Sequence, residues 1–162
     1  MHEHIYHHDQ YAGVGAKEFI PAIVEGVRKA YGSSLEIRYE VDTLHIDRDR
    51  ATPLALLLSE LATNAFKYAF PTGPGALNVS LQREDEEGRA ILVFRDNGVG
   101  MLEPSVEKSR SMGMRLVKAS VAQMDGSFLF ANDAGTVFRS DLALDIRSAE
   151  LAISRFGRAR AH

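Results

Sequence analysis

"ILVFRDNGVG", residues 91–100, begins as an apolar strand and ends in a charged pair followed by two closely spaced glycines. A hairpin turn at Asn97-Gly98 is one interpretation, because this dipeptide is a common signal for such a turn. However, the following segment lacks the alternation of a second strand. The other interpretation is a ligand pocket, because Asp96 closes a buried strand and an unpaired buried carboxylate is costly.

A nucleotide base would suit such a pocket. Its exocyclic amine would donate to Asp96, while Gly98 and Gly100 would let the base approach the backbone. The phosphate-loop motif GxxxxGK[ST] is missing, and no third glycine stands at position 103 to complete GxGxxG. The stretch therefore predicts a nucleotide site that is neither a phosphate loop nor a dinucleotide fingerprint.

The segments on either side alternate between helical and strand patterns. Leu77, Val79 and Leu81 alternate as in a strand, which a charged turn joins to residues 91–95 as a hairpin. The other expected elements are helices over 16–30, ending near Gly32, and 112–124, and strands over 35–41, 127–131 and 136–144. This order predicts an α/β (α+β) fold with two layers, in which a mixed, largely antiparallel sheet packs on helices.

One further helix is expected between Thr52-Pro53, an N-cap residue followed by proline, and Pro71. Most of its residues are apolar, but Glu60, Thr63, Asn64 and Lys67 fall on one stripe at helical spacing. The stripe is either a solvated face or part of a magnesium–polyphosphate site. Mg²⁺ takes oxygen ligands, and lysine neutralises phosphate.

A second glycine signal precedes the helix over 112–124. Ser111 and Gly113 stand at its start, where free N–H groups and the helix dipole favour phosphate, and Arg115 is adjacent. A simple junction between loop and helix is the alternative interpretation of this glycine.

The composition excludes several classes of protein. The 162 residues, 45% hydrophobic and 25% charged, fit one soluble domain. The absence of cysteine excludes disulfides and cysteine-based zinc sites. A net charge of −3 lacks the basic excess of a nucleic-acid-binding domain, and we interpret the arginine-rich end as a solvated tail. No apolar run approaches the length of a membrane helix, so we expect no direct membrane contact by this piece.

Four ordered motifs carry a family resemblance: "SELATNAFKYAF" (residues 59–70), "DNGVGM" (96–101), "SMGMRLV" (111–117) and "GTVF" (135–138). Together they resemble the ATP-binding catalytic domain of bacterial two-component sensor histidine kinases. These kinases share the GHKL superfamily and its Bergerat ATP-binding fold with gyrase, the large heat-shock chaperone and MutL. The sequences of these motifs are most similar to those of the group related to the HWE kinases. The Trp-x-Glu signature of the HWE kinases themselves is replaced by Phe94-Arg95-Asp96.

The resemblance implies ATP and Mg²⁺ as cofactors and assigns roles to the residues. Glu60, Asn64 and Lys67 would be catalytic, with Asn64 and Glu60 on the metal. Asp96 would accept the adenine amine, and residues 101–111 would form a mobile lid. The implied nucleotide-binding residues are Asn64, Lys67, Tyr68, Asp96, Gly98, Gly100, Met101, Ser111, Met112, Gly113, Met114, Arg115, Leu116 and Thr136.

The resemblance also implies an organisation and partners. Residues 1–12 would end the last helix of a truncated dimerisation and phosphoacceptor region, 13–146 would be the ATP-binding domain, and 147–162 the basic tail. None of the six histidines has the sequence context of a phosphoacceptor, and we interpret the histidine-rich start as a helix end rather than a metal site. We therefore expect a cytoplasmic protein that binds ATP and ADP. It would phosphorylate a histidine on the dimerisation and phosphoacceptor domain of the same kinase, and the phosphoryl group would then pass to a response-regulator aspartate.

Two other functions stay open. An anti-sigma-factor-type serine kinase shares these motifs, and a degenerate phosphotransfer or binding module would keep the fold without ATP.

Overall fold

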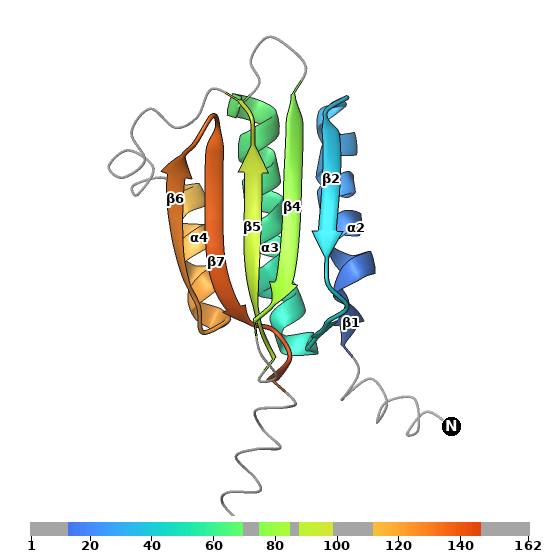
Figure 1. Ribbon diagram of the computed structural model, residues 1–162, viewed down its shortest axis with the longest axis vertical. Helices are drawn as coiled ribbons and strands as arrows, with labels where there is room; N and C mark the ends of the chain where they lie inside the picture. Colours follow the sequence, from blue (N-terminus) through green and yellow to red (C-terminus); the bar gives the residue numbers. More distant parts are fainter. Residues whose placement is uncertain (1–12, 70–74, 85–87, 99–111, 147–162) are drawn as a thin grey trace, which may run out of the picture.

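A five-stranded sheet and a layer of helices make up the fold of this computed structural model (Figure 1). The structure describes residues 13–69, 75–84, 88–98 and 112–146. The strands are β2 (Glu36–Val41), β4 (Ala76–Arg83), β5 (Arg89–Asp96), β6 (Ser127–Asn132) and β7 (Thr136–Ala143). They lie in the order β2-β4-β5-β7-β6; β2 and β4 are parallel, and the other neighbours are antiparallel. The predicted mixed, largely antiparallel sheet is confirmed.

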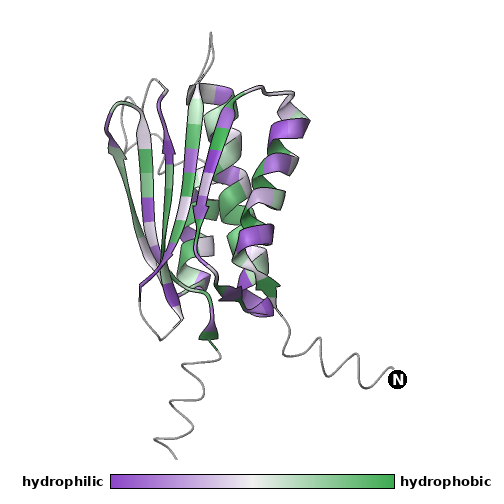
Figure 2. Cartoon of the chain, turned by 45° about the vertical axis from the view of Figure 1, so that its right-hand side comes forward, coloured by the Kyte–Doolittle hydropathy of each residue, from purple (hydrophilic) through white to green (hydrophobic). Residues whose placement is uncertain are grey.

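In the part of the chain that the structure describes, three helices cover one face of the sheet: α2 (Ala16–Tyr31), α3 (Arg48–Asn64) and α4 (Met112–Gln123). Ala16, Ile20 and Val24 of α2 are buried and recur at helical spacing, and hydrophilic residues lie between them along this helix (Figure 2). The predicted end of the first helix is confirmed, because Gly32 adopts the left-handed conformation that glycine accepts readily. Within the described residues, no helix has both the length and the apolar character needed to cross a membrane.

The core lies between the two layers. Alternate residues of the central strands point into it, so Val79, Phe94 and Phe138 stand in register across three strands and are almost fully buried. From the helical side α3 contributes Leu54, Leu57, Leu58 and Leu61 to the same core. Burial of each leucine side chain stabilises the fold by roughly 1.5–3 kcal/mol, which makes α3 the main helical support of the sheet.

The start of α3 differs from the prediction. The helix begins at Arg48, with Asp47 as its N-cap residue, and Pro53 lies inside it. The expectation that Thr52-Pro53 opens the helix was wrong because contacts from distant residues hold Asp47 in an extended conformation. Its N–H donates to the Leu144 carbonyl at 2.8 Å, and its carboxylate accepts the Ile146 N–H.

A short antiparallel ribbon, absent from the sequence-based expectation, joins β1 (Val14–Gly15) to β3 (His45–Ile46). Strands of two residues give too little alternation to be recognised. The ribbon places the residues before α2 beside those before α3.

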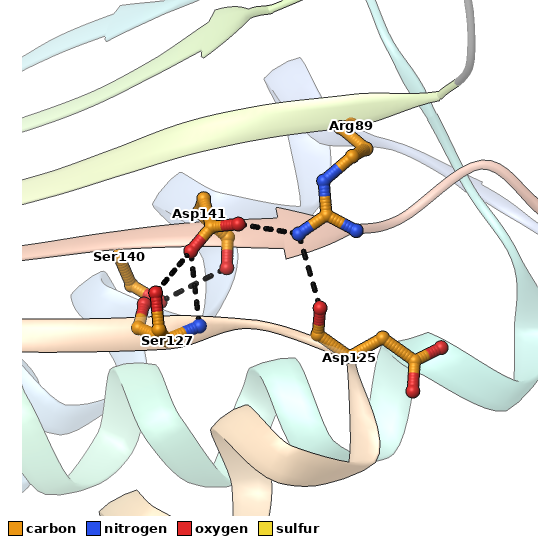
Figure 3. A network of polar contacts seen from close by, with 5 residues as sticks. All are labelled: Arg89, Asp125, Ser127, Ser140 and Asp141. Atoms are coloured by element: carbon orange, nitrogen blue, oxygen red, sulfur yellow. Dashed lines mark hydrogen bonds and ion pairs between the residues drawn. The ribbon is translucent and has the colours of Figure 1, made fainter.

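A polar network fastens β5, β6 and β7 at the end of the sheet remote from Asp96 (Figure 3). Arg89 forms an ion pair with Asp141 and donates to the Asp125 carbonyl at 3.0 Å. The hydroxyl and the N–H of Ser127 donate to Asp141 Oδ1 at 2.7 and 2.9 Å. The Ser127 hydroxyl, its N–H and Arg89 together lower the pKa of Asp141 to about 2, against the opposing effect of burial.

Candidate functional site

Asp96 is the last residue of β5 and points into the space between the sheet and the helices. It stands opposite Leu77 in the register and follows Leu92 and Phe94 on the inward face of the strand. Only 6% of its surface is exposed. A carboxylate in this position needs hydrogen-bond donors, as the sequence predicted.

Two backbone N–H groups meet that need from one side. Gly98 N–H and Thr136 N–H donate to Asp96 Oδ1 at 2.9 and 3.1 Å. Among the described residues, no hydrogen bond reaches Oδ2. Asp96 is therefore held in place by Oδ1 and retains acceptor capacity at Oδ2. Thr136 supports Asp96 through its backbone rather than through its hydroxyl.

The hairpin interpretation of Asn97-Gly98 was wrong. β5 pairs with β4 on one edge and with β7 on the other, so a strand following Gly98 has no edge of β5 available. Asn97 instead joins the start of β4: its side-chain oxygen accepts the Ala76 N–H at 2.9 Å, and its own N–H donates to the Ala76 carbonyl at 3.3 Å.

Gly135 belongs to the candidate site, although the sequence-based interpretation did not assign it. Its φ of +134° is unfavourable for any residue with a side chain, and a Cβ there would lie 2.0 Å from the Asp96 carbonyl oxygen. This glycine lets the turn between β6 and β7 approach Asp96 closely enough for the Thr136 bond. The signal in the sequence was its place directly before Thr136 in "GTVF".

The polar stripe of α3 ends at the same end of the molecule as Asp96 (Figure 1). Glu60 and Asn64 are half-buried, whereas Lys67 is exposed. Lys67 lies in a π-helical turn, η1 (Ala65–Ala69), which continues α3. The wider turn changes the direction of Lys67 relative to Glu60 and Asn64 from that expected for uniform α-helical spacing. Turns of this kind are rare and are frequent at functional sites.

Glu60 brings α3 into contact with the start of α4. A Cβ added at Gly113 would lie 2.0 Å from Glu60 Oε1, so the carboxylate rests against the first turn of α4. The positive end of the helix dipole stabilises an anion at this position. The motif over residues 59–70 therefore contacts the motif over residues 111–117 at the N-terminus of α4, which the sequence predicted as a phosphate site.

The remaining predicted residues of α4 divide between core and surface. Met114 is buried in the core, Leu116 is half-buried and Arg115 is exposed. Gly100, Met101 and Ser111 lie outside the described residues, as does the predicted lid over 101–111; for Tyr68 and Met112 only the backbone is described. Residues 1–12 and 147–162, expected as a helix end and a basic tail, also lie outside them.

The arrangement gathers the chemistry of nucleotide binding at one end of the sheet. A buried acceptor at Asp96, close backbone at Gly98 and Gly135, a helix N-terminus at Gly113 and oxygen ligands on α3 would together suit a base, its phosphates and a divalent cation.

Comparison with known proteins agrees with this arrangement. The sequence profile of the family described as histidine kinase-, DNA gyrase B-, and HSP90-like ATPase matches residues 49–146. The chain is similar to the sensor histidine kinase PdtaS of Mycobacterium tuberculosis, with 36% identity over 84 residues covering 51% of this chain and 17% of the relative. It is also similar to blue-light-activated histidine kinase 1 of Erythrobacter litoralis, with 31% identity over 112 residues covering 67% of this chain and 31% of the relative.

The fold has solved counterparts. The histidine kinase domain of the Erythrobacter litoralis EL346 blue-light-activated histidine kinase superposes with a TM-score of 0.70 at 20% identity, covering 82% of this chain and 63% of that chain. The chain thus spans about a sixth to a third of the length of these curated relatives.

Proposed function

The chain belongs to the family of histidine kinase-, DNA gyrase B- and HSP90-like ATPases, and from that membership we propose that it is the ATP-binding catalytic domain of a sensor histidine kinase. One relative named above is a sensor histidine kinase and the other a blue-light-activated histidine kinase, and residues 49–146, which the family profile matches, include all four motifs.

Asp96 carries this proposal. An adenine amine donating to Oδ2 would complete the hydrogen bonding of a buried carboxylate whose other oxygen already accepts two backbone N–H groups. The adjacent glycines, Gly98 and Gly135, keep the backbone close to the base. Adenine presents a donor at this position and guanine a carbonyl acceptor, so a fixed carboxylate selects ATP.

Residues of α3, η1 and α4 would bind the phosphates of ATP and the magnesium ion. Asn64 offers an oxygen ligand of the type that Mg²⁺ prefers, Glu60 would ligate the ion through water, and the bound ion would neutralise charge on the phosphates. Lys67 and Arg115, both exposed at this end, would meet the phosphates directly. The free N–H groups at the start of α4 would add donors around Gly113.

The proposed reaction is transfer of the γ-phosphoryl group to a histidine outside this chain. A bond forms between the imidazole nitrogen and phosphorus as the bond to the ADP oxygen breaks, and Glu60 would take the imidazole proton. Catalysis would rest on in-line positioning and charge neutralisation. We place the acceptor on the kinase's own dimerisation region, with a response-regulator aspartate as the next acceptor and the cytoplasm as the location.

The test combines binding and transfer. Calorimetric titration with a non-hydrolysable ATP analogue should show binding that Mg²⁺ strengthens. With γ-labelled ATP, the chain alone should stay unlabelled, and adding the kinase's dimerisation region should give acid-labile, base-stable label on that region. A chain that binds no ATP analogue would refute the nucleotide assignment. Acid-stable label on a serine-bearing partner would identify a serine kinase, and acid-labile label on this chain alone would place the acceptor here.

A further inference from the structure

Three potential metal ligands meet at the end of the fold opposite Asp96. One ring nitrogen of His45 and one carboxylate oxygen each of Asp47 and Asp145 all lie within 4.8 Å of one another. They come from β3, the N-cap of α3 and the residues just after β7. β7 runs from Thr136, beside Asp96, to Ala143, so about 25 Å of strand separates the two sites.

The side chain of Asp47 does not cap the N-terminus of α3. Aspartate at an N-cap position normally accepts an N–H from the first helical turn, but Asp47 makes no such bond. One of its oxygens accepts the Ile146 N–H, and Oδ1 lies 3.3 Å from His45 Nε2. Contacts across the fold, not the needs of α3, thus orient this carboxylate toward the histidine.

His45 presents a buried nitrogen to the cluster. Nε2 is inaccessible to water and makes no hydrogen bond, although it lies at ion-pair distance from Asp47. The backbone of Gly13 packs over it, since a Cβ there would be 2.6 Å from Nε2. A neutral imidazole nitrogen in this position is a metal ligand of the usual kind.

The two aspartates are almost fully buried and already ordered. Asp47 is 8% and Asp145 9% exposed. The backbone of Asp145 is fixed by a 3.1 Å hydrogen bond from its N–H to the Gly88 carbonyl. Both aspartates make further polar contacts, so a cation would join a preorganised group. Two buried carboxylates within 4.8 Å repel each other, and a divalent cation would relieve that repulsion.

The distances fit a transition metal. Two ligands about 2.05 Å from a tetrahedral Zn²⁺ lie roughly 3.4 Å apart, close to the observed 3.3 Å between His45 Nε2 and Asp47 Oδ1. The Asp145 oxygen would have to approach by at most about 1.4 Å to complete the same triangle. The His45 side chain is 21% exposed but Nε2 itself is covered, so the residues over Nε2 would have to move to admit the ion and a water as fourth ligand.

We propose that His45, Asp47 and Asp145 form a structural site for a divalent transition metal such as Zn²⁺, which accepts both imidazole and carboxylate ligands. The ion would fasten the start of α3 to the segment after β7, and through β3 to the β1 ribbon. It is independent of ATP and of the magnesium proposed above.

The test uses a chain in which His45 is the only histidine, made by replacing His2, His4, His7, His8 and His162 with glutamine, since those residues offer competing ligands. Without nucleotide, Zn²⁺ should bind to this chain and raise its Tm by several degrees, whereas Mg²⁺ should not. Co²⁺ should give the intense visible absorption of a tetrahedral centre, and the His45 ring nitrogens should shift in NMR spectra.

Adding Asp145→Asn or His45→Gln should weaken Zn²⁺ binding by about 100-fold or more. The control, Asp49→Asn, removes an exposed carboxylate two residues from Asp47 and should leave binding unchanged. The proposal is overturned if the single-histidine chain shows no Co²⁺ spectrum and no Zn²⁺ stabilisation, or if Asp145→Asn and Asp49→Asn bind Zn²⁺ equally. The Co²⁺ spectrum of the single-histidine chain tests the proposal even if Asp145→Asn or His45→Gln prevents folding.

Discussion

Replacing Asp96 with asparagine should separate nucleotide binding from folding. The amide keeps the shape of the carboxylate, and its oxygen can still accept the Gly98 and Thr136 N–H groups, which now lie 2.9 and 3.1 Å from Oδ1. The Oδ2 position becomes an NH₂ group. It would confront the adenine amine with a second donor, so the bond to the base is lost.

The magnitude follows from the hydrogen bonds. Weakening two charge-assisted bonds to neutral ones costs about 1 kcal/mol each, and removing a buried charge offsets part of that, so the free energy of unfolding should fall by no more than ~2 kcal/mol. Loss of the charge-assisted bond to adenine costs about 1.5–3 kcal/mol, or roughly 10- to 150-fold in ATP affinity.

Calorimetric titration with non-hydrolysable ATP and GTP analogues measures both affinity and base selectivity. The wild-type chain should prefer ATP, and Asp96→Asn should narrow or reverse that preference, because an amide NH₂ can donate to the guanine carbonyl. Urea unfolding and circular dichroism establish that the variant is folded.

The matched control is Asp133→Asn, which removes the same charge at the same end of the sheet. Asp133 has a side chain that is 71% exposed and pairs with Arg95 at 3.2 Å, so its loss should leave ATP affinity and selectivity unchanged. A folded Asp96→Asn variant with wild-type affinity and an unaltered ATP-to-GTP ratio would refute the adenine assignment. Equal losses in both variants would indicate a general charge effect instead.

Three further outcomes are expected. Gly113→Ala should leave the free energy of unfolding within about 1 kcal/mol of wild type, because the new Cβ displaces only the flexible end of the Glu60 side chain. The variant should nevertheless slow phosphoryl transfer to the added dimerisation region. An unchanged rate of transfer would show that Glu60 takes no part in catalysis. Asn64→Ala should reduce the effect of Mg²⁺ on ADP affinity more than affinity without Mg²⁺, as titrations with and without the ion would show. The pKa of Asp141 is lowered to about 2 in the folded state from 3.8, so its stabilisation is present above pH 4 and lost as the pH falls toward 2. With its side chain 35% exposed, this amounts to about 1 kcal/mol, and urea unfolding of Asp141→Asn across that range should show a correspondingly shallower pH dependence.

Much of the fold follows from local patterns in the sequence. Alternation in Leu77, Val79 and Leu81 and the apolar run before Asp96 predicted the central hairpin, because a strand that is buried on one face must alternate its side chains. Gly32 similarly marked the end of the first helix. Asp96 was recognisable as a candidate site residue, since a carboxylate that ends a buried strand requires hydrogen-bond donors.

Only the tertiary structure decided which groups meet those requirements. The Thr136 N–H that holds Asp96 lies forty residues away, the Glu60 carboxylate meets Gly113 on another helix, and the start of α3 is set at Asp47 by Leu144 and Ile146. The pairing of β1 with β3 and the trio of His45, Asp47 and Asp145 also join segments distant in sequence. A local sequence pattern predicts the type and the ends of one helix or strand. The contacts described here form only when the sheet and the helices pack together, because that packing decides which donors and acceptors surround each buried polar group.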